Sequence, residues 1–363
     1  MSENLEKDFI EDEHKETIVA KCKNCGGNTV FDPATQQLKC LFCNSYRDFS
    51  KNSNVQELDV EQIILNGETW DNSASCYRCD NCGAVVVLSP TETAKDCPYC
   101  GTSHIVKSQE LIGLKPNAVY PFTVTKESCT EIVKTWAKKR LFISNKFKKS
   151  ATLENLYGVY EPCFTYDSQT HSTYNGVIGI RRERVVGSGK NRRVVTWTEW
   201  RKIGGTYTEF FDDVMVSSGD GITQKQLNAL LPYNFSTIKV YEQSYLTGFM
   251  AHKNNSSVKD GWEKSKKYID VALRKNILSN YHYDVVDYLN VSTTHSGVTY
   301  KYVLLPIYHM LYKHKNKLFK VFVNGNTGKV AGKYPLSIFK ILLAVLLGLG
   351  LIFLVGLLFY NYY

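Results

Sequence analysis

The sequence lacks the features that mark several common classes of protein. Its first twenty residues are polar and acidic and contain no apolar run, so we expect no secretory signal peptide. It has no G-x4-G-K-S/T phosphate loop, because the similar stretch before Lys190 carries Arg184 at the first glycine position and Asn191 at the Ser/Thr position. The histidines lack ligand spacing, and no Ser/His/Asp set or pair of carboxylates is evident. We therefore predict that the protein is not an enzyme.

Acidic residues are missing from the last part of the chain, where Asp287 is the final one. Eight lysines follow it. A lysine-rich flank beside an apolar segment predicts the cytoplasmic side of a membrane and attracts anionic lipid headgroups, although an ordinary solvated basic face is the alternative. The lysines that we expect near anionic lipid are Lys313, Lys315, Lys317, Lys320, Lys333 and Lys340.

One long apolar run is present, Ile341–Tyr360, which contains twenty residues and no charge. A helix of that length spans about 30 Å, the thickness of a bilayer's hydrocarbon core. We predict a single transmembrane helix over 338–360, and a buried core helix is the alternative. With three residues after the run and a lysine flank before it, we expect a tail anchor in the cell membrane with the N-terminus in the cytoplasm.

Cysteine, in contrast, is plentiful and regularly spaced. Two C-x2-C pairs separated by fourteen residues make one quartet, and the same arrangement returns 57 residues later. Zinc binds four thiolates in a tetrahedron, so the repeat predicts two zinc ribbons with two structural Zn2+ ions. Disulfides are the alternative, but no export signal supports them. The predicted ligands are Cys22, Cys25, Cys40, Cys43, Cys79, Cys82, Cys97 and Cys100.

Each predicted site has four sulfur ligands and no open position, which indicates a structural rather than a catalytic metal. Cys76 forms an overlapping C-x2-C pair with Cys79, but the repeat spacing and Gly83 favour Cys79 and Cys82 as ligands. A redox role for Cys76 stays as the alternative. The cysteines expected to be spare, buried thiols are Cys76, Cys129 and Cys163.

Beyond about residue 103 the pattern predicts an α+β body rich in antiparallel strands. We expect helices over 125–141 and 256–280, with Thr125 or Ser128 capping the first and Ser257 the second. The predicted strands cover 172–180, 184–187, 193–203, 206–216, 301–312 and 318–323. The expected division is a disordered acidic arm (1–18), zinc ribbon 1 (19–50), a linker (51–75), zinc ribbon 2 (76–104), the body (105–335) and the transmembrane helix (338–360).

A glycine-rich turn at 187–191 predicts a β-hairpin with a strongly basic composition. Such a hairpin could contact nucleic acid or phospholipid, or it could be a solvated sheet edge. Its arginines are Arg181, Arg182, Arg184, Arg192 and Arg193.

Several segments occur in a recognisable order before the apolar run: CKNCGG, FDPATQQLKCLFC, CDNCGA, DCPYCG, LYGVYEPCF, KYVLLPIYHM and VNGNTGKVAGKYP. Together they resemble the bacterial membrane-anchored double zinc-ribbon proteins, over about residues 20–340. Such proteins are often described as transcription-factor-IIB-like or primosomal-helicase-like. The resemblance implies that the eight cysteines named above bind zinc. Asn44 departs from the pattern, because a knuckle glycine is common there.

Some proteins of this kind are encoded beside phage-shock protein A-like and stomatin/flotillin-type proteins. The resemblance therefore implies a membrane-anchored adaptor that binds cytoplasmic protein partners in an envelope-stress response. The alternative is a nucleic-acid-binding zinc-ribbon protein of transcription or replication, without helicase activity of its own. Acidic residues near the second cysteine quartet, among them Asp80 and Asp96, disfavour that alternative.

Overall fold

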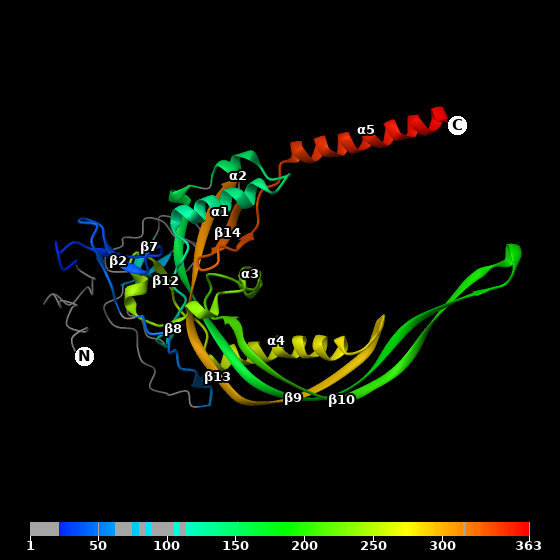
Figure 1. Ribbon diagram of the computed structural model, residues 1–363, viewed down its shortest axis with the longest axis horizontal. Coiled ribbons are helices and arrows are strands. Elements are labelled where there is room, and N and C mark those ends of the chain that lie inside the picture. The colour runs from blue at the N-terminus through cyan, green and yellow to red at the C-terminus, as the bar shows by residue number, and fades with distance from the viewer. Residues whose placement is uncertain are drawn as a thin grey trace.

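The computed structural model describes residues 22–49, 51–61, 75–79, 85–88, 105–108, 114–150, 152–314 and 317–362. The fold is α+β with antiparallel sheets, and a single apolar helix extends from the body near the C-terminal end (Figure 1). This confirms the expected fold class at that level. The domain limits given above remain expectations.

A small antiparallel sheet lies at the N-terminal side and contains β1 (Thr29–Asp32), β2 (Gln37–Cys40) and β3 (Tyr46–Arg47). Phe31 in β1 is buried, and its ring lies 5.3 Å from that of Tyr245 in an edge-on contact. The Phe31 backbone N–H also donates to the Thr247 carbonyl at 2.9 Å. The small sheet is therefore packed onto the body by apolar contact and by hydrogen bonding.

Three long strands form the centre of the large sheet: β9 (Leu156–Val186), β10 (Arg193–Ser217) and β13 (Val285–His314). β9 lies between the other two and is antiparallel to both. The three strands curve together, and the β9–β10 hairpin continues beyond β13 as a two-stranded ribbon (Figure 1).

The four separate strands predicted between residues 172 and 216 are wrong in extent, because β9 and β10 run without interruption through most of that range. Gly204 and Gly205 do not end a strand. They lie against Tyr174 on β9, whose hydroxyl stands 3.2 Å from where a Gly205 Cβ would be. The glycines thus give room to a cross-strand tyrosine. The predicted hairpin turn is confirmed, with a short 3-10 turn at Gly189–Asn191.

Shorter strands complete the large sheet on both sides of this centre. On the β9 side, β12 pairs with β6, which pairs with β5, which pairs with β7. β7 therefore extends the small group of strands that contains Cys79. The bounds are β4 (Leu58–Asp59), β5 (Ser75–Cys79), β6 (Val85–Leu88), β7 (Ile105–Ser108), β8 (Ala118–Val119), β11 (Lys239–Val240), β12 (Met250–His252), β14 (Lys317–Asn324) and β15 (Val330–Gly332).

The helices begin where the sequence offers a hydroxyl cap. The Thr125 side chain accepts the Ser128 N–H at 3.2 Å, and the Ser257 side chain accepts the Asp260 N–H at 3.1 Å, as predicted. The helix bounds are α1 (Lys126–Lys138), α2 (Asn145–Lys149), α3 (Gln224–Leu230) and α4 (Val258–Ser279), with further 3-10 turns at Leu153–Asn155, Phe235–Thr237 and Gln243–Leu246.

The core lies around the first half of β9 and the last half of β13, where both faces of the sheet are covered. Val159–Ser168 and Tyr300–Met310 are continuously buried. Aromatic side chains fill much of this region, and Tyr160, Phe164 and Tyr302 are among its fully buried members. α4 contributes a buried apolar stripe that includes Leu273.

The apolar helix α5 covers Ile338–Tyr362, close to the predicted bounds. Its span Ile338–Phe359 has a mean hydropathy of 3.1, and none of its most apolar stretch is buried by the body. By length and composition it can cross a bilayer. Its first turn is tied to the body, because the Lys340 ammonium donates to the Ile143 carbonyl at 2.9 Å and to the Asn145 side chain at 2.7 Å.

Candidate metal centre

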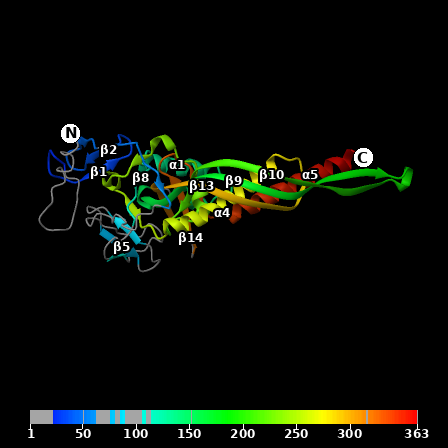
Figure 2. The same ribbon diagram turned by 90° about the horizontal axis from the view of Figure 1, so that it is seen from below.

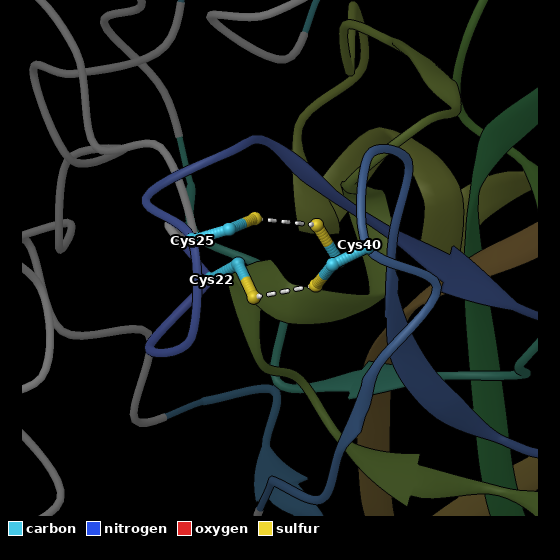
Figure 3. A group of neighbouring side chains, drawn as sticks. Cys22, Cys25 and Cys40 are labelled. Atoms are coloured by element: carbon cyan, nitrogen blue, oxygen red, sulfur yellow. Dashed lines mark hydrogen bonds between the residues drawn. The ribbon is translucent and has the colours of Figure 1, made fainter.

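The first cysteine quartet converges on one point. The sulfur atoms of Cys22 and Cys43 are 3.6 Å apart, and those of Cys25 and Cys40 are 3.5 Å apart. All four sulfurs lie within 4.8 Å of one another. In Figure 3 the side chains of Cys25 and Cys40 point toward each other. A tetrahedral ion with metal–sulfur bonds of about 2.3 Å separates its ligands by about 3.8 Å, so these four cysteines can hold a metal ion.

Local backbone geometry explains why these short segments bring the sulfurs together. The Gly26 N–H donates to the Cys22 carbonyl at 2.8 Å, which closes the first knuckle, and Gly26 has a φ of 70°. In the second knuckle Asn44 has a φ of 55°. Asparagine tolerates this left-handed conformation better than most residues do. Asn44 can therefore take the place of the usual glycine without disrupting the knuckle.

The hydroxyl of Ser45 is a second contact of the site, at 3.2 Å from the Cys22 sulfur and 3.0 Å from the Cys43 sulfur. Its hydrogen bond, aided by backbone N–H groups, lowers the pKa of Cys22 to about 6 and also lowers the pKa of Cys43. A backbone hydrogen bond lowers the pKa of Cys25, but the neighbouring sulfurs outweigh it and raise that pKa to about 12. Four thiolates this close repel one another, and a bound cation would offset their charge.

The second predicted quartet is only partly within the described residues. Cys79 is buried at the end of β5, whereas Cys82, Cys97 and Cys100 lie outside the described residues. Cys76 lies within the same strand, three residues before Cys79. The expected burial of the remaining thiols is confirmed for Cys129 and Cys163. The cysteines found free of disulfides are Cys22, Cys25, Cys40, Cys43, Cys79, Cys129 and Cys163.

Two large apolar side chains project from the metal centre into solvent. Leu41 and Phe42 lie between Cys40 and Cys43 of this quartet, and they are 59% and 73% exposed. The Phe42 N–H donates to the Cys40 sulfur at 3.4 Å, so the knuckle holds the backbone from which the exposed ring projects. This exposed pair is the metal centre's own apolar surface, and we call it the knuckle patch.

A buried group of three side chains was not evident in the sequence. Glu161 on β9 lies between His252 on β12 and His309 on β13, with nitrogen–oxygen distances of 3.2 and 3.0 Å. Each side chain is about 1% exposed. Burial would raise the pKa of Glu161, but its hydrogen bonds to the two histidines and its electrostatic interaction with them outweigh this effect and hold the pKa at about 2. This geometry is typical of a polar network that fixes the pairing of three neighbouring strands.

A second polar group surrounds Lys301 on β13. Its ammonium lies 2.8 Å from Glu57, 3.5 Å from Asp167 and 2.9 Å from Asp213. Asp213 sits at a bulge in β10 with a φ of 51°, and its N–H donates to Asp167 at 2.6 Å. Asp167, Asp212 and Asp213 are close enough together to be considered as metal ligands. The Lys301 ammonium, however, already supplies a cation at this cluster.

Neither polar group has a local sequence signal. Glu161 and His252, for example, are 91 residues apart and meet only because β9 and β12 are neighbours. An isolated acid within the apolar stretch LYGVYEPCF was the one available hint, because a buried carboxylate needs a partner.

Comparison with known proteins gives one distant relative. The chain is 28% identical over 328 residues to the uncharacterized protein YdjG of Bacillus subtilis (strain 168), and the alignment covers 88% of this chain and 91% of that protein. No family model and no solved structure matches the chain. The similarity extends over nearly the full length of both proteins, so it includes much more than the cysteine motifs.

Proposed function

We propose that the protein is a membrane-anchored adaptor whose zinc-ribbon region and body bind a cytoplasmic protein partner and hold it at the membrane. The observation that carries the proposal is α5, an apolar helix of bilayer length whose most hydrophobic stretch is covered by nothing in the body. In water such a surface would drive aggregation, whereas a bilayer buries it at no cost to backbone hydrogen bonds.

The surroundings of the first turn of α5 support this proposal. The 141–144 loop lies beside it, because Ile143 forms a β-bridge with Leu336 and the Ser337 N–H donates to Phe142 at 2.7 Å. Leu141 is 79% exposed here. Lysines of α2 add positive charge next to these apolar groups: Lys146, Lys148 and Lys149. Apolar and cationic groups together suit the headgroup layer on the cytoplasmic side.

We propose that the metal in the first site is zinc and that the second quartet binds a second structural zinc ion. All-sulfur ligation with no His or carboxylate favours zinc, and the repeat of the first quartet at equal spacing supports the second site. The Cys25→Ser variant should lower the zinc content of the purified protein by one ion per chain. Cys129→Ser removes a buried cysteine that belongs to neither quartet and should leave the zinc content unchanged. Equal zinc in wild type and Cys25→Ser would contradict the assignment.

The knuckle patch is the part of the metal-binding region that we assign to partner binding. A metal with four protein ligands has no open position for substrate, so its role is to hold backbone and side chains in place. The backbone at Phe42 is held in this way, and the Leu41 and Phe42 side chains remain exposed. Buried aromatic anchors supply much of the affinity in protein interfaces. By resemblance, the partner is a phage-shock protein A-like or stomatin/flotillin-type protein.

The test is affinity purification of the full chain from membranes in mild detergent, with bound proteins quantified for wild type and for Phe42→Ser. Specific partners should co-purify with wild type, and their affinity should fall by about thirtyfold for Phe42→Ser, because loss of an aromatic anchor costs about 2 kcal/mol. Phe235→Ser is the control, since Phe235 is also an exposed phenylalanine, at 49% against 73% for Phe42, but belongs to the 3-10 turn Phe235–Thr237 and not to a knuckle.

Three outcomes would count against parts of this proposal. Equal recovery of partners with Phe42→Ser and Phe235→Ser would show that the knuckle patch does not bind the partner. Salt-dependent retention of the chain on DNA, without any enriched protein, would favour the nucleic-acid alternative. Cleavage of the cysteine region by protease added to intact cells would overturn the cytoplasmic orientation.

A further inference from the structure

The far end of the β9–β10 hairpin, residues 181–202, carries both strong positive charge and exposed apolar side chains. It contains eight basic and two acidic residues, a net charge of +6 (8 − 2). We call this segment the hairpin tip. Beyond Gly179, β9 pairs only with β10 among the described strands, so most of the tip is a ribbon without a third strand. Its exposed apolar side chains are Val185, Val194, Val195, Trp197 and Trp200.

These side chains occupy both faces of the ribbon. Directly paired residues of antiparallel strands share a face, so Trp197 lies beside Arg182 on one face and Val194 beside Val185 on the other. Trp200 packs over Gly179, where an added Cβ would come within 2.9 Å of the indole ring. The two indoles nevertheless remain 49% and 53% exposed. A two-stranded ribbon has no core of its own in which to bury them.

The β9–β10 hairpin extends from the same side of the body as the apolar helix α5 (Figures 1 and 2). The start of α5 is tied to the body through Lys340 and the Ile143–Leu336 bridge. From there α5 and the hairpin both extend away from the same side of the body, and two perpendicular views agree on this (Figures 1 and 2). A bilayer that receives α5 therefore lies on the side toward which the hairpin tip reaches.

We propose that the hairpin tip binds the anionic headgroup layer of the bilayer that α5 enters, which gives the protein a second contact with the membrane. The proposal rests on the membrane anchoring assigned to α5. Arginine guanidinium groups bind lipid phosphates through paired hydrogen bonds, and indole rings favour the headgroup level, where one edge is apolar and the other wet. Nucleic acid would also attract the arginines, but its phosphate backbone offers nothing to valines exposed on both faces.

The experiment is hydrogen–deuterium exchange of the full chain in lipid nanodiscs, read out by mass spectrometry of peptides from the hairpin tip. One set of discs contains phosphatidylcholine alone, and the other contains about one third phosphatidylglycerol. We expect amide exchange in the tip to slow by about tenfold or more in the anionic discs, since several cations each favour an anionic surface. High salt should reverse this protection, because it screens charges beyond about 3 Å at 1 M.

Two sets of substitutions make the result specific. Replacement of Arg181, Arg184, Arg192 and Arg193 by Gln should abolish the difference between the two kinds of disc. The matched control replaces four exposed lysines of α4 and should leave the difference intact: Lys259, Lys264, Lys267 and Lys275. Exchange of buried amides in α4 shows that each variant is folded.

Other outcomes overturn the proposal. Equal exchange of the tip in both kinds of disc removes the lipid contact while leaving the α5 anchor in place. Protection by an oligonucleotide but not by anionic discs would assign the tip to nucleic acid. Protection that depends on protein concentration in phosphatidylcholine discs would assign it to a second copy of the chain. Failure of the chain to enter discs at all overturns both this inference and the anchoring on which it rests.

Discussion

The two ends of β9 are parts of one strand but have opposite surroundings. Val159–Ser168 is buried on both faces, whereas 181–185 is exposed on both faces. Between them, burial alternates from residue to residue around 170–173, as in a strand with one face on a core. The comparison shows that a single strand can contain a buried base, a half-buried middle and a free tip. The base specifies the fold, and the tip is available for binding.

The largest difference in stability should be seen between two variants, one that removes an aromatic ring from the buried base of β9 and one that removes a ring from the hairpin tip. Phe164→Ala deletes a fully buried ring at the base and should reduce the free energy of unfolding by about 4 kcal/mol. Trp197→Ala deletes a half-exposed ring at the tip and should cost below about 0.5 kcal/mol. Urea unfolding of both variants in mild detergent measures the difference. Similar losses for the two would show that the tip also contributes to the core's stability.

A smaller but pH-dependent effect should come from Glu161→Gln at the base. The folded-state pKa of Glu161 is about 2, below its unfolded value of about 4.3, so its stabilising contribution is complete above the unfolded pKa. That contribution is lost as the pH falls toward 2. At neutral pH we expect Glu161→Gln to lower the free energy of unfolding by about 3 kcal/mol.

The pH dependence separates this explanation from a simple packing defect. The difference between wild type and Glu161→Gln should shrink from neutral pH to about pH 3, measured by chemical unfolding at each pH. Glu263→Gln is the control, because Glu263 is a largely exposed acid paired with Lys266 on α4. A difference that stays constant with pH would mean that the carboxylate charge has no role.

The smallest effect should come from the ion pair at the tip. Arg182 and Glu199 are 2.8 Å apart, and both side chains are half exposed. Glu199→Gln should therefore change the free energy of unfolding by less than about 0.5 kcal/mol, because water and salt screen exposed pairs. Amide exchange of the hairpin peptides provides a local measure in addition to global unfolding. If Glu199→Gln lowered the free energy of unfolding by nearly as much as Glu161→Gln, the tip would contribute to stability as the base does, and the comparison would fail.

Features set by neighbouring residues could be predicted from the sequence. The caps Thr125 and Ser257 each lie within three residues of the amide that they bind. The knuckle cysteines are likewise close in sequence, and the apolar run of α5 is continuous. In these cases the stabilising contact lies within a few residues, so its pattern is visible without the fold.

Features that depend on strand pairing could not be predicted. The first half of β13, 285–299, shows little apolar pattern, because hydroxyl groups replace apolar contacts across the ladder. Ser172 and Thr293, for example, hydrogen-bond at 2.9 Å between β9 and β13. Glu161 and Lys301 find their partners only after distant strands meet. Sequence analysis therefore found the first cysteine quartet and the apolar helix but missed the polar groups of the core.

β9 also has a mechanical consequence, because it runs without a break from the hairpin tip into the core. A force applied to the tip along β9 would load its hydrogen bonds to β13 in shear, since ladder bonds lie perpendicular to antiparallel strands. Many bonds would then share the load at once instead of opening one by one. A pull on the tip along β9 would therefore be carried into the body by the whole β9–β13 ladder.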